Sequence, residues 1–295
     1  MKTSLDCIPC FFRQALETSK MIGAGRRKQK IILDELARIL PKFPLKISPP
    51  EIAREINILI SKVTGNKDPY KVIKEKSNRL ALRIYPDLKN KVSHSSDRLL
   101  AAVELAIAGN IIDYGVKNSL NVNEELKKIL SKEKRVIKKE RKAIFNYAKF
   151  KQAIAKAKNI LYLADNAGET VFDRILIEEI KNIDDNKDII YAVKAFPVIN
   201  DALRQDAVFC GIDKLATIVS SGSDAPGTVL SLCKKSFLKL YKKADMVISK
   251  GQGNFEALSG ARRPIFFLFM AKCPVIAEYA GCKLGDIALL YSEAN

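Results

Sequence analysis

Long apolar runs are missing from this chain: no stretch approaches the roughly 18 consecutive apolar residues that a membrane-spanning helix needs. The beginning of the sequence also lacks a basic region that leads into a long apolar run, which argues against a secretory signal. Cysteine is sparse, with 6 in 295 residues, and this excludes the dense disulfide scaffold of small secreted domains. These absences predict a cytoplasmic, globular protein.

Signatures of nucleic-acid binding are missing as well, although Lys and Arg number 51 against 33 Asp and Glu, a formal net charge of +18. No RRM, KH, zinc-finger or basic-zipper pattern is present. Thirteen of the basic residues lie between Lys127 and Lys158, in a segment that is typical of a solvated helix. Nucleic acid is therefore not the expected partner, and a basic surface also attracts small anions such as phosphate esters.

One pair of cysteines, Cys7 and Cys10, has the CxxC spacing. Such a pair supplies half of a zinc site, which other cysteines could complete in space. Buried or redox-inert thiols near the start of a helix are an equally good interpretation. The sequence leaves both interpretations open.

Two patterns divide the chain near residue 155. Before this point, apolar residues recur at helical spacing in four segments: 8–21, 31–40, 52–63 and 99–112. After it, helical patterns lie between several short apolar runs of strand length: 159–164, 189–195, 215–219, 245–249 and 265–269. Continuous apolar strands that alternate with helices predict an α/β fold with a mostly parallel sheet covered on both faces. We therefore predict an α/β core at 156–295, which carries a ligand-binding site, and a helical subdomain at 1–155, which caps that site.

Oxygen-bearing side chains follow two of the predicted strands, where ligands bind in open parallel sheets. Asp165 and Asn166 follow the first strand, in the motif DNAGET, and Asp201 follows the second. Together they predict a site for one cation, because oxygen ligands suit Mg²⁺ or Mn²⁺ better than zinc. The helix that begins near Gly168 would add backbone N–H groups that favour a phosphate. Alternatively, these side chains simply cap the helices that follow them.

The loop KGQGNFE at 250–256 follows the fourth predicted strand. Its glycines let the backbone approach a ligand closely, and Lys250 is placed to meet a phosphoryl group as a point charge. Gln252 and Asn254 can donate hydrogen bonds to a phosphate or a sugar. Neither the Walker motif GxxxxGK[ST] nor the dinucleotide fingerprint GxGxxG is present, so a tight turn beside a buried Lys is the alternative.

In the helical half, Asn110 and Asp113 lie three residues apart at the end of an apolar helix, in the motif GNIIDYG. They could reach over the edge of the sheet as part of a cap. By physical reasoning alone, satisfaction of the helix end by these side chains is the better interpretation.

Taken in order, these motifs resemble a known family, the damage-control metal-dependent phosphatases, formerly called domain of unknown function 89. The resemblance rests on the CxxC start and on six further motifs: DPYK…K…N (68–78, with Lys74 and Asn78), AGNIID (108–113), DNAGE (165–169), ND (200–201), GxDxPG (222–227) and KGQGNFE (250–256). They span most of the chain, and DNAGE together with KGQGNFE is fairly specific. The short length and the CxxC start are similar to the compact branch of archaea and some bacteria.

The resemblance implies a helical subdomain on a doubly wound α/β/α core, with Asp165, Asn166 and Asp201 as ligands of one divalent cation (Mg²⁺, Mn²⁺, Co²⁺ or Ni²⁺). It implies hydrolysis of small phosphorylated metabolites, such as sugar phosphates, nucleotides or cofactor fragments, in metabolite damage control. We predict Asp165, Asp201 and Lys250 as catalytic residues. The predicted substrate-binding residues are Gly168, Glu169, Gln252, Asn254, Glu256, Asn110 and Asp113. The alternatives are an S-adenosylmethionine-dependent carboxyl methyltransferase, as proposed for a relative, and a basic nucleic-acid-binding protein.

Overall fold

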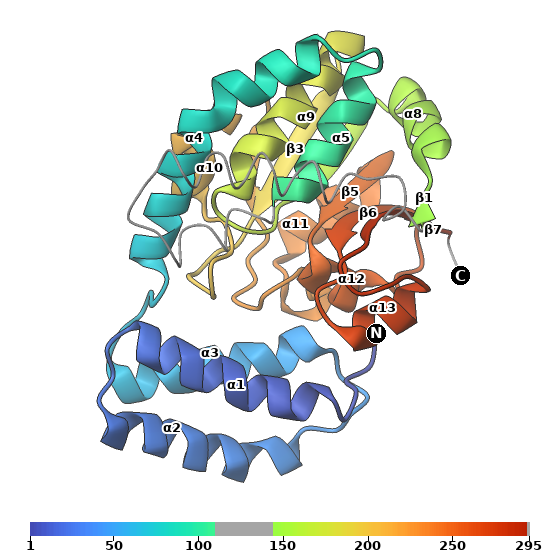
Figure 1. The fold of residues 1–295 in the computed structure, drawn as a ribbon. Coiled ribbons are helices and arrows are strands. Elements are labelled where there is room, and N and C mark those ends of the chain that lie inside the picture. Colours follow the sequence, from blue (N-terminus) through green and yellow to red (C-terminus); the bar gives the residue numbers. More distant parts are fainter. Residues whose placement is uncertain (110–143, 294–295) are drawn as a thin grey trace.

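A mostly parallel β-sheet forms the centre of the computed structural model, which describes residues 1–109 and 144–293 (Figure 1). Within these residues the sheet has seven strands in the order β1-β7-β6-β5-β2-β3-β4. The strands are β1 (Ile144–Phe145), β2 (Asn159–Leu163), β3 (Asp188–Val193), β4 (Thr217–Ser220), β5 (Met246–Lys250), β6 (Ile265–Met270) and β7 (Ile287–Ser292). All neighbouring strands pair in parallel except β6 and β7. The expected α/β class with a mostly parallel sheet is confirmed.

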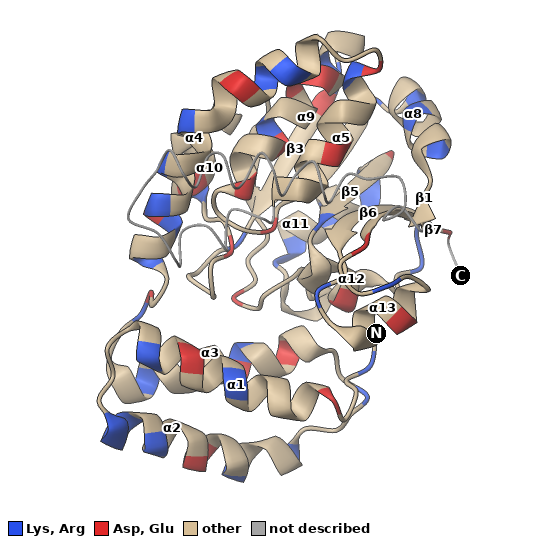
Figure 2. Ribbon diagram, in the orientation of Figure 1, with Lys and Arg blue, Asp and Glu red and all other residues tan. Residues whose placement is uncertain are grey.

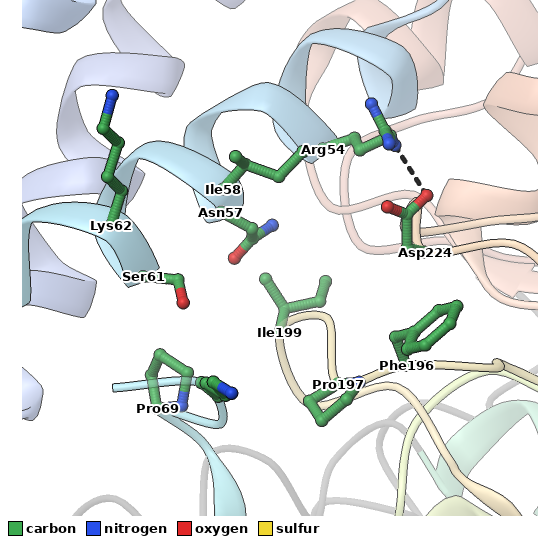
Figure 3. Close-up of a pocket in the computed structure, with 11 residues that line it drawn as sticks. Arg54, Asn57, Ile58, Ser61, Lys62, Pro69, Phe196, Pro197, Ile199 and Asp224 are labelled. Atoms are coloured by element: carbon green, nitrogen blue, oxygen red, sulfur yellow. Dashed lines mark hydrogen bonds and ion pairs between the residues drawn. The ribbon is translucent and has the colours of Figure 1, made fainter. Parts of the chain in front are cut away.

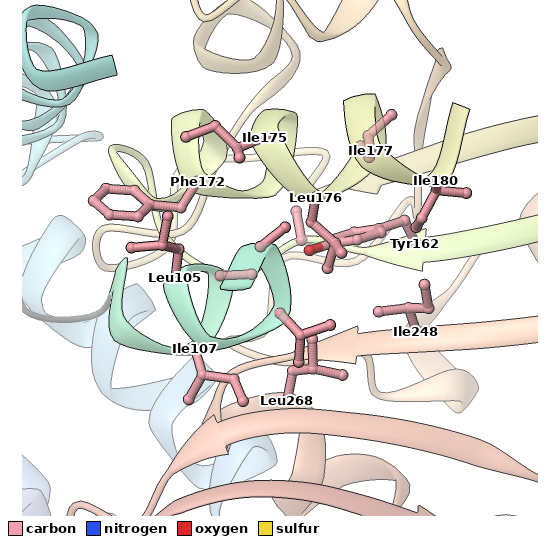
Figure 4. Packing of buried hydrophobic residues seen from close by; sticks show 14 of the residues in the cluster. Leu105, Ile107, Tyr162, Phe172, Ile175, Leu176, Ile177, Ile180, Ile248 and Leu268 are labelled. Carbon is pink, nitrogen blue, oxygen red and sulfur yellow. The ribbon is translucent and has the colours of Figure 1, made fainter. Parts of the chain in front are cut away.

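Helices cover both faces of this sheet. The helices in the described residues are α1 (Cys7–Met21), α2 (Arg26–Ile39), α3 (Pro49–Thr64), α4 (Lys71–Ser93), α5 (Arg98–Ala108), α8 (Tyr147–Lys156), α9 (Glu169–Ile183), α10 (Arg204–Phe209), α11 (Lys235–Lys243), α12 (Gln252–Leu258) and α13 (Pro274–Ala280). Alternate residues of each strand point to opposite faces, so Tyr162 joins the core under α5 and α9, whereas Leu161 joins the core under α11 to α13. Figure 4 shows the first core, where Phe172 and Leu176 of α9 and Leu105 of α5 meet over the sheet. The core is therefore doubly wound.

The first three helices pack around a small core of their own. Phe11, Ile32, Leu36 and Ile56 are buried there, and the helices form a separate layer in Figure 1. In contrast, α4 and α5 contribute their apolar residues to the core over the sheet, against α9. The division at residue 155 stays a prediction, and the packing shows that two helices before this point belong to the covering of the sheet.

Several elements differ from the sequence-based expectations. Pro86 lies inside the 23-residue helix α4, although a proline usually interrupts a helix. β7 was not predicted. It is the second strand from one edge of the sheet and pairs antiparallel with β6, unlike the parallel strands that the alternation of strands and helices predicts. The five predicted strands all form and begin or end within two residues of the expected bounds.

The basic charge of the described residues is spread over several helices. Figure 2 shows Lys and Arg on α2, α4 and α8, with acidic residues between them on α2 and α4. Most of the basic segment between Lys127 and Lys158 lies outside the described residues, as do Asn110 and Asp113. No helix in the described ranges is both long and apolar enough to cross a membrane.

Candidate active site

The candidate site lies where the winding of the sheet changes direction. β2 is flanked by β3 on one side and by β5 on the other, and all three run in parallel. From β2 the chain proceeds outward to β3 and β4, and it then returns to the other side of β2 with β5 and β6. Ligands of doubly wound proteins bind at the carboxyl edge of such a switch point. The loops after β2 and β5, which carry DNAGET and KGQGNFE, are therefore neighbours at this edge.

Backbone pairing brings the three predicted metal ligands together. Asn166 and Asp201 form an isolated antiparallel bridge. Next to it, the Ala202 N–H donates to the carbonyl oxygen of Asp165 at 2.8 Å. The side chains of Asp165, Asn166 and Asp201 are all buried, and Asp201 is only 1% exposed. The structure thus places these residues side by side, although they come from two different loops.

Several carboxyl groups lie close together in this buried region. Burial raises the pKa of Asp165 well above its usual range, and the nearby carboxylates of Glu169 and Asp201 raise it further. Burial also raises the pKa of Asp201, although Lys194, with its Nζ 3.5 Å from Oδ2 of Asp201, opposes the change. A bound cation stabilises buried carboxylates that repel one another, because it replaces the solvation that they lose on burial.

The chemistry of the donor atoms fits a hard divalent cation. Nδ2 of Asn166 donates to Oδ2 of Asp165 at 3.0 Å and to Oε1 of Glu169 at 2.9 Å, which leaves the amide oxygen of Asn166 as its possible ligand atom. Oδ2 of Asp201 is buried and accepts no hydrogen bond from the described residues. In the described residues no three His, Cys, Asp or Glu side chains are arranged as a metal site. The candidate set contains only two such residues, because its third member is an asparagine.

Lys250 lies beneath this site in a buried charged network. Its Nζ is 2.7 Å from Oδ1 of Asp173 and 3.2 Å from Oε2 of Glu169. Burial alone would lower the pKa of Lys250, but the carboxylates of Asp173 and Glu169 outweigh it and raise this pKa. Glu169 therefore connects Lys250 to Asn166, and through it to the predicted metal ligands.

Sequence reasoning missed Asp173, which is fully buried. It accepts hydrogen bonds from the hydroxyls of Tyr162 at 2.8 Å and Tyr191 at 2.7 Å, in addition to the bond from Lys250. A signal was present, since Asp173 follows Glu169 by four residues and such a pair shares one face of a helix. An acidic pair on an otherwise apolar helix face indicates a buried basic partner.

The N–H of Gly168, expected to be free for a phosphate, has a partner inside the protein. It donates to Oδ1 of Asn78 at 2.7 Å. Nδ2 of Asn78 in turn donates to Oδ1 of Asp206 at 2.7 Å. This side chain from α4 thus joins the DNAGET loop to α10, and substrate binding by the Gly168 N–H stays a prediction.

Asn254 ties together the loops after β2, β4 and β5. Its Nδ2 donates to the carbonyl oxygens of Ala164 at 3.0 Å and Lys250 at 2.7 Å, and its Oδ1 accepts from the Thr228 hydroxyl at 2.7 Å. Because the side chain is fully buried, its observed contacts hold the loops in place. Its predicted contact with substrate is untested.

Gln252 and Glu256 lie on the half-buried side of α12. Nε2 of Gln252 donates to Oε1 of Glu256 at 2.8 Å, while its Oε1 accepts from the Lys272 N–H at 2.9 Å. Burial raises the pKa of Glu256 to about 7, and the hydrogen bond from Gln252 opposes this. Substrate binding by Gln252 and Glu256 stays a prediction.

The cysteines of the CxxC pair are free thiols. Cys7 is half-buried and Cys10 is exposed, and neither forms a disulfide. Burial raises the pKa of both thiols above the ordinary value. No zinc site is completed around them within residues 1–109 and 144–293.

Gly251 has a conformation and an environment that exclude a side chain. Its φ is +79°, and a Cβ atom added there would lie 1.9 Å from Oδ2 of Asp165. We expect Gly251→Ala to displace the Asp165 carboxylate and to destabilise the fold by about 2 kcal/mol, since both strain and overlap oppose the methyl group. Calorimetric titration with Mn²⁺ and urea unfolding would measure the two effects.

The matched control is Gly260→Ala, because a Cβ atom at Gly260 would meet no atom of residues 1–109 or 144–293 within 4 Å. This variant should bind the cation and unfold as the unchanged protein does. Equal cation affinity in both variants would show that Asp165 does not depend on the close approach of Gly251.

Fold and site together define an α/β protein with a buried, oxygen-rich site at the switch point of a doubly wound sheet. The sequence model of the damage-control phosphatase ARMT1-like domain matches residues 3–288. The chain therefore belongs to the damage-control phosphatase ARMT1-like domain family.

Relatives of similar length support this membership. A protein of Pyrococcus horikoshii named damage-control phosphatase is 37% identical over 298 residues, which cover 99% of each chain. An uncharacterised protein of Methanocaldococcus jannaschii is 36% identical and covers 98% of this chain and 95% of its own. The crystal structure of a DUF89 family protein from Pyrococcus horikoshii superposes with a TM-score of 0.90 at 31% identity, over 99% of this chain and 100% of that one.

Proposed function

We propose that this protein hydrolyses phosphomonoesters of small metabolites with one divalent cation, held by Asp165, Asn166 and Asp201. The observation that carries this proposal is the bridge between Asn166 and Asp201, which gathers two buried carboxylates and one amide at the switch point. The buried Oδ2 of Asp201 supports the same proposal: it accepts no hydrogen bond from the described residues and has only the longer ion pair with Lys194, at 3.5 Å. Membership of the phosphatase family supports the reaction type.

The chain's own residues would orient the reactants and move one proton. A bound cation would supply charge for a phosphoryl oxygen and make a water more acidic. Asp165 or Asp201 accepts the proton of the attacking water, since both carboxylates belong to the candidate cation site. Nζ of Lys250 has two acceptors among the described residues, so its third N–H is the one that can face a phosphoryl oxygen. Glu169 fixes the amide of Asn166 and thereby the direction of its oxygen.

The proposed substrates are small phosphorylated metabolites, such as sugar phosphates, nucleotides or cofactor fragments, in metabolite damage control. The net charge of +18 favours anionic substrates in general. The preferred cation would be one with affinity for oxygen ligands, among Mg²⁺, Mn²⁺, Co²⁺ and Ni²⁺.

A screen of phosphate release would test this function. We expect the purified protein to release phosphate from at least one of these ester classes when Mg²⁺, Mn²⁺, Co²⁺ or Ni²⁺ is present, and the rate should fall to background with excess EDTA. Restoration by the added cation is the control for damage by the chelator. A protein that cleaves no ester with any of these cations would contradict the proposal, and steeply salt-dependent binding to DNA or RNA would then favour the nucleic-acid-binding alternative.

A further inference from the structure

A pocket of about 420 Å³ lies between the N-terminal helices and the loop that leads to Asp201. This volume is in the range of pockets that hold small organic ligands. One wall is α3, and the opposite wall is the loop after β3. The described residues that line it are Arg54, Asn57, Ile58, Ser61, Lys62, Lys67, Pro69, Phe196, Pro197, Ile199 and Asp224. Figure 3 shows Ile199 pointing from the loop toward α3.

The walls of this pocket combine apolar surface with positive charge. Phe196 is 59% exposed and Ile58 is 43% exposed, so both offer apolar area that an occupant could cover. The lining contains three basic side chains, Arg54, Lys62 and Lys67, against one carboxylate, Asp224. Arg54 is paired with Asp224 at 2.6 Å, whereas Lys62 and Lys67 are exposed. The pocket therefore suits an organic group that carries a negative charge.

The pocket shares its loops with the candidate active site. Ile199 lines the pocket, and Asp201 is only two residues further along, which is a backbone span of at most about 7 Å. Ile199 has a φ of +38°, a conformation that side chains with a branched Cβ rarely adopt. The other loop brings Asp224 to the pocket and Gly227 to the site, where its carbonyl oxygen accepts a hydrogen bond from Lys194.

We propose that this pocket binds the part of the substrate that is not hydrolysed: a short apolar chain or ring that bears a second anionic group. Its apolar part would cover Phe196 and Ile58, and its anionic end would lie near Lys67. The phosphoryl group of the same molecule would lie beside Asp201. This inference rests on the proposed phosphatase function for the position of the phosphoryl group, while the pocket itself can be tested by binding alone.

The absence of tryptophan makes a direct binding test possible. Phe196→Trp places a single indole at the pocket, and the exposure of Phe196 lets the larger ring fit. The probe is the phosphate ester of 6-hydroxyhexanoate, and hexyl phosphate is the matched compound without the second anionic group. We expect a saturable change of fluorescence with the carboxylated ester and about fivefold weaker binding of hexyl phosphate, as expected for loss of one exposed charge pair.

Charge reversal identifies the residue that recognises the second group. Lys67→Glu, made in the Phe196→Trp background, should weaken binding of the carboxylated ester by about tenfold and leave hexyl phosphate within about twofold. Lys46→Glu is the control, because Lys46 is an exposed residue of the same helical layer outside the pocket lining and the net charge changes equally. Calorimetric titration of the unchanged protein with both esters repeats the comparison without the indole.

The possible results separate the two proposals. Equal affinity for both esters, or equal weakening by Lys67→Glu and Lys46→Glu, would overturn the pocket proposal even if the protein releases phosphate. Selective binding that Lys67→Glu removes would support the pocket even if no ester is cleaved, and only the phosphatase function would then fail.

Discussion

Replacing Asp165 with asparagine is expected to lower cation-stimulated phosphate release by about a thousandfold or more, equivalent to roughly 4 kcal/mol of transition-state stabilisation. The reason is that one of two carboxylates in the candidate metal site loses its charge, while the shape of the side chain is kept. This matters here because Asp165 packs directly against the backbone of Gly251. Turnover numbers measured at saturating Mn²⁺ would give the size of the loss.

The same substitution should stabilise the cation-free protein, although it lowers activity. The folded-state pKa of Asp165 lies above its ordinary value of 3.8, so stability falls as the pH rises from that value toward the folded pKa. Asp165→Asn removes this loss and should raise the free energy of unfolding at neutral pH. Urea unfolding at several pH values, with EDTA present, would measure it.

Added Mn²⁺ should reverse the order of stability. The unchanged protein gains stability from the bound cation, by about 2.7 kcal/mol at a hundred times its dissociation constant, whereas the variant gains little. Asp188→Asn serves as the control, because Asp188 is exposed at the opposite end of β3. An Asp165→Asn variant that keeps both its turnover and its stabilisation by Mn²⁺ would show that Asp165 is not part of the proposed site.

The position of the candidate site could be predicted from the sequence because the relevant signals are local. Each of the strands β2 to β6 is an apolar run, and a parallel sheet places the residues that follow such runs at one edge. Asp165, Asn166 and Asp201 all follow strands directly or within one loop, so their approach could be expected. The structure places them side by side through the bridge between Asn166 and Asp201.

The supporting contacts could not be predicted because they join distant parts of the chain. Asn78 on α4 belongs to the motif DPYK…K…N, but its contact with Gly168 spans 90 residues and no spacing rule connects the two. Tyr162 and Tyr191 look like ordinary core residues of strands, yet their hydroxyls meet at Asp173. The antiparallel strand β7 was also missed, since the alternating pattern of strands and helices predicts parallel neighbours only.

Asp173→Ala is expected to reduce the free energy of unfolding by about 3–5 kcal/mol. The carboxylate is fully buried and accepts from Lys250, Tyr162 and Tyr191, so its removal leaves two hydroxyls without an acceptor. Among the described residues, Lys250 would retain Glu169 as its hydrogen-bond acceptor, with Oε2 at 3.2 Å. A loss of this size is a large part of the roughly 5–15 kcal/mol that stabilise a typical domain. Urea unfolding followed by circular dichroism would measure it.

Single hydroxyl deletions show whether the effect comes from the network or from general disturbance of the core. Tyr191→Phe removes a donor to a charged acceptor and should cost about 1.5–3 kcal/mol. Tyr241→Phe is the matched control, because the buried Tyr241 hydroxyl has no hydrogen-bond partner in the part of the chain that the structure describes, so its removal should cost nothing. If both tyrosine variants lose equal stability, or if Asp173→Ala unfolds within 1 kcal/mol of the unchanged protein, Asp173 does not hold Lys250 in the way the distances indicate.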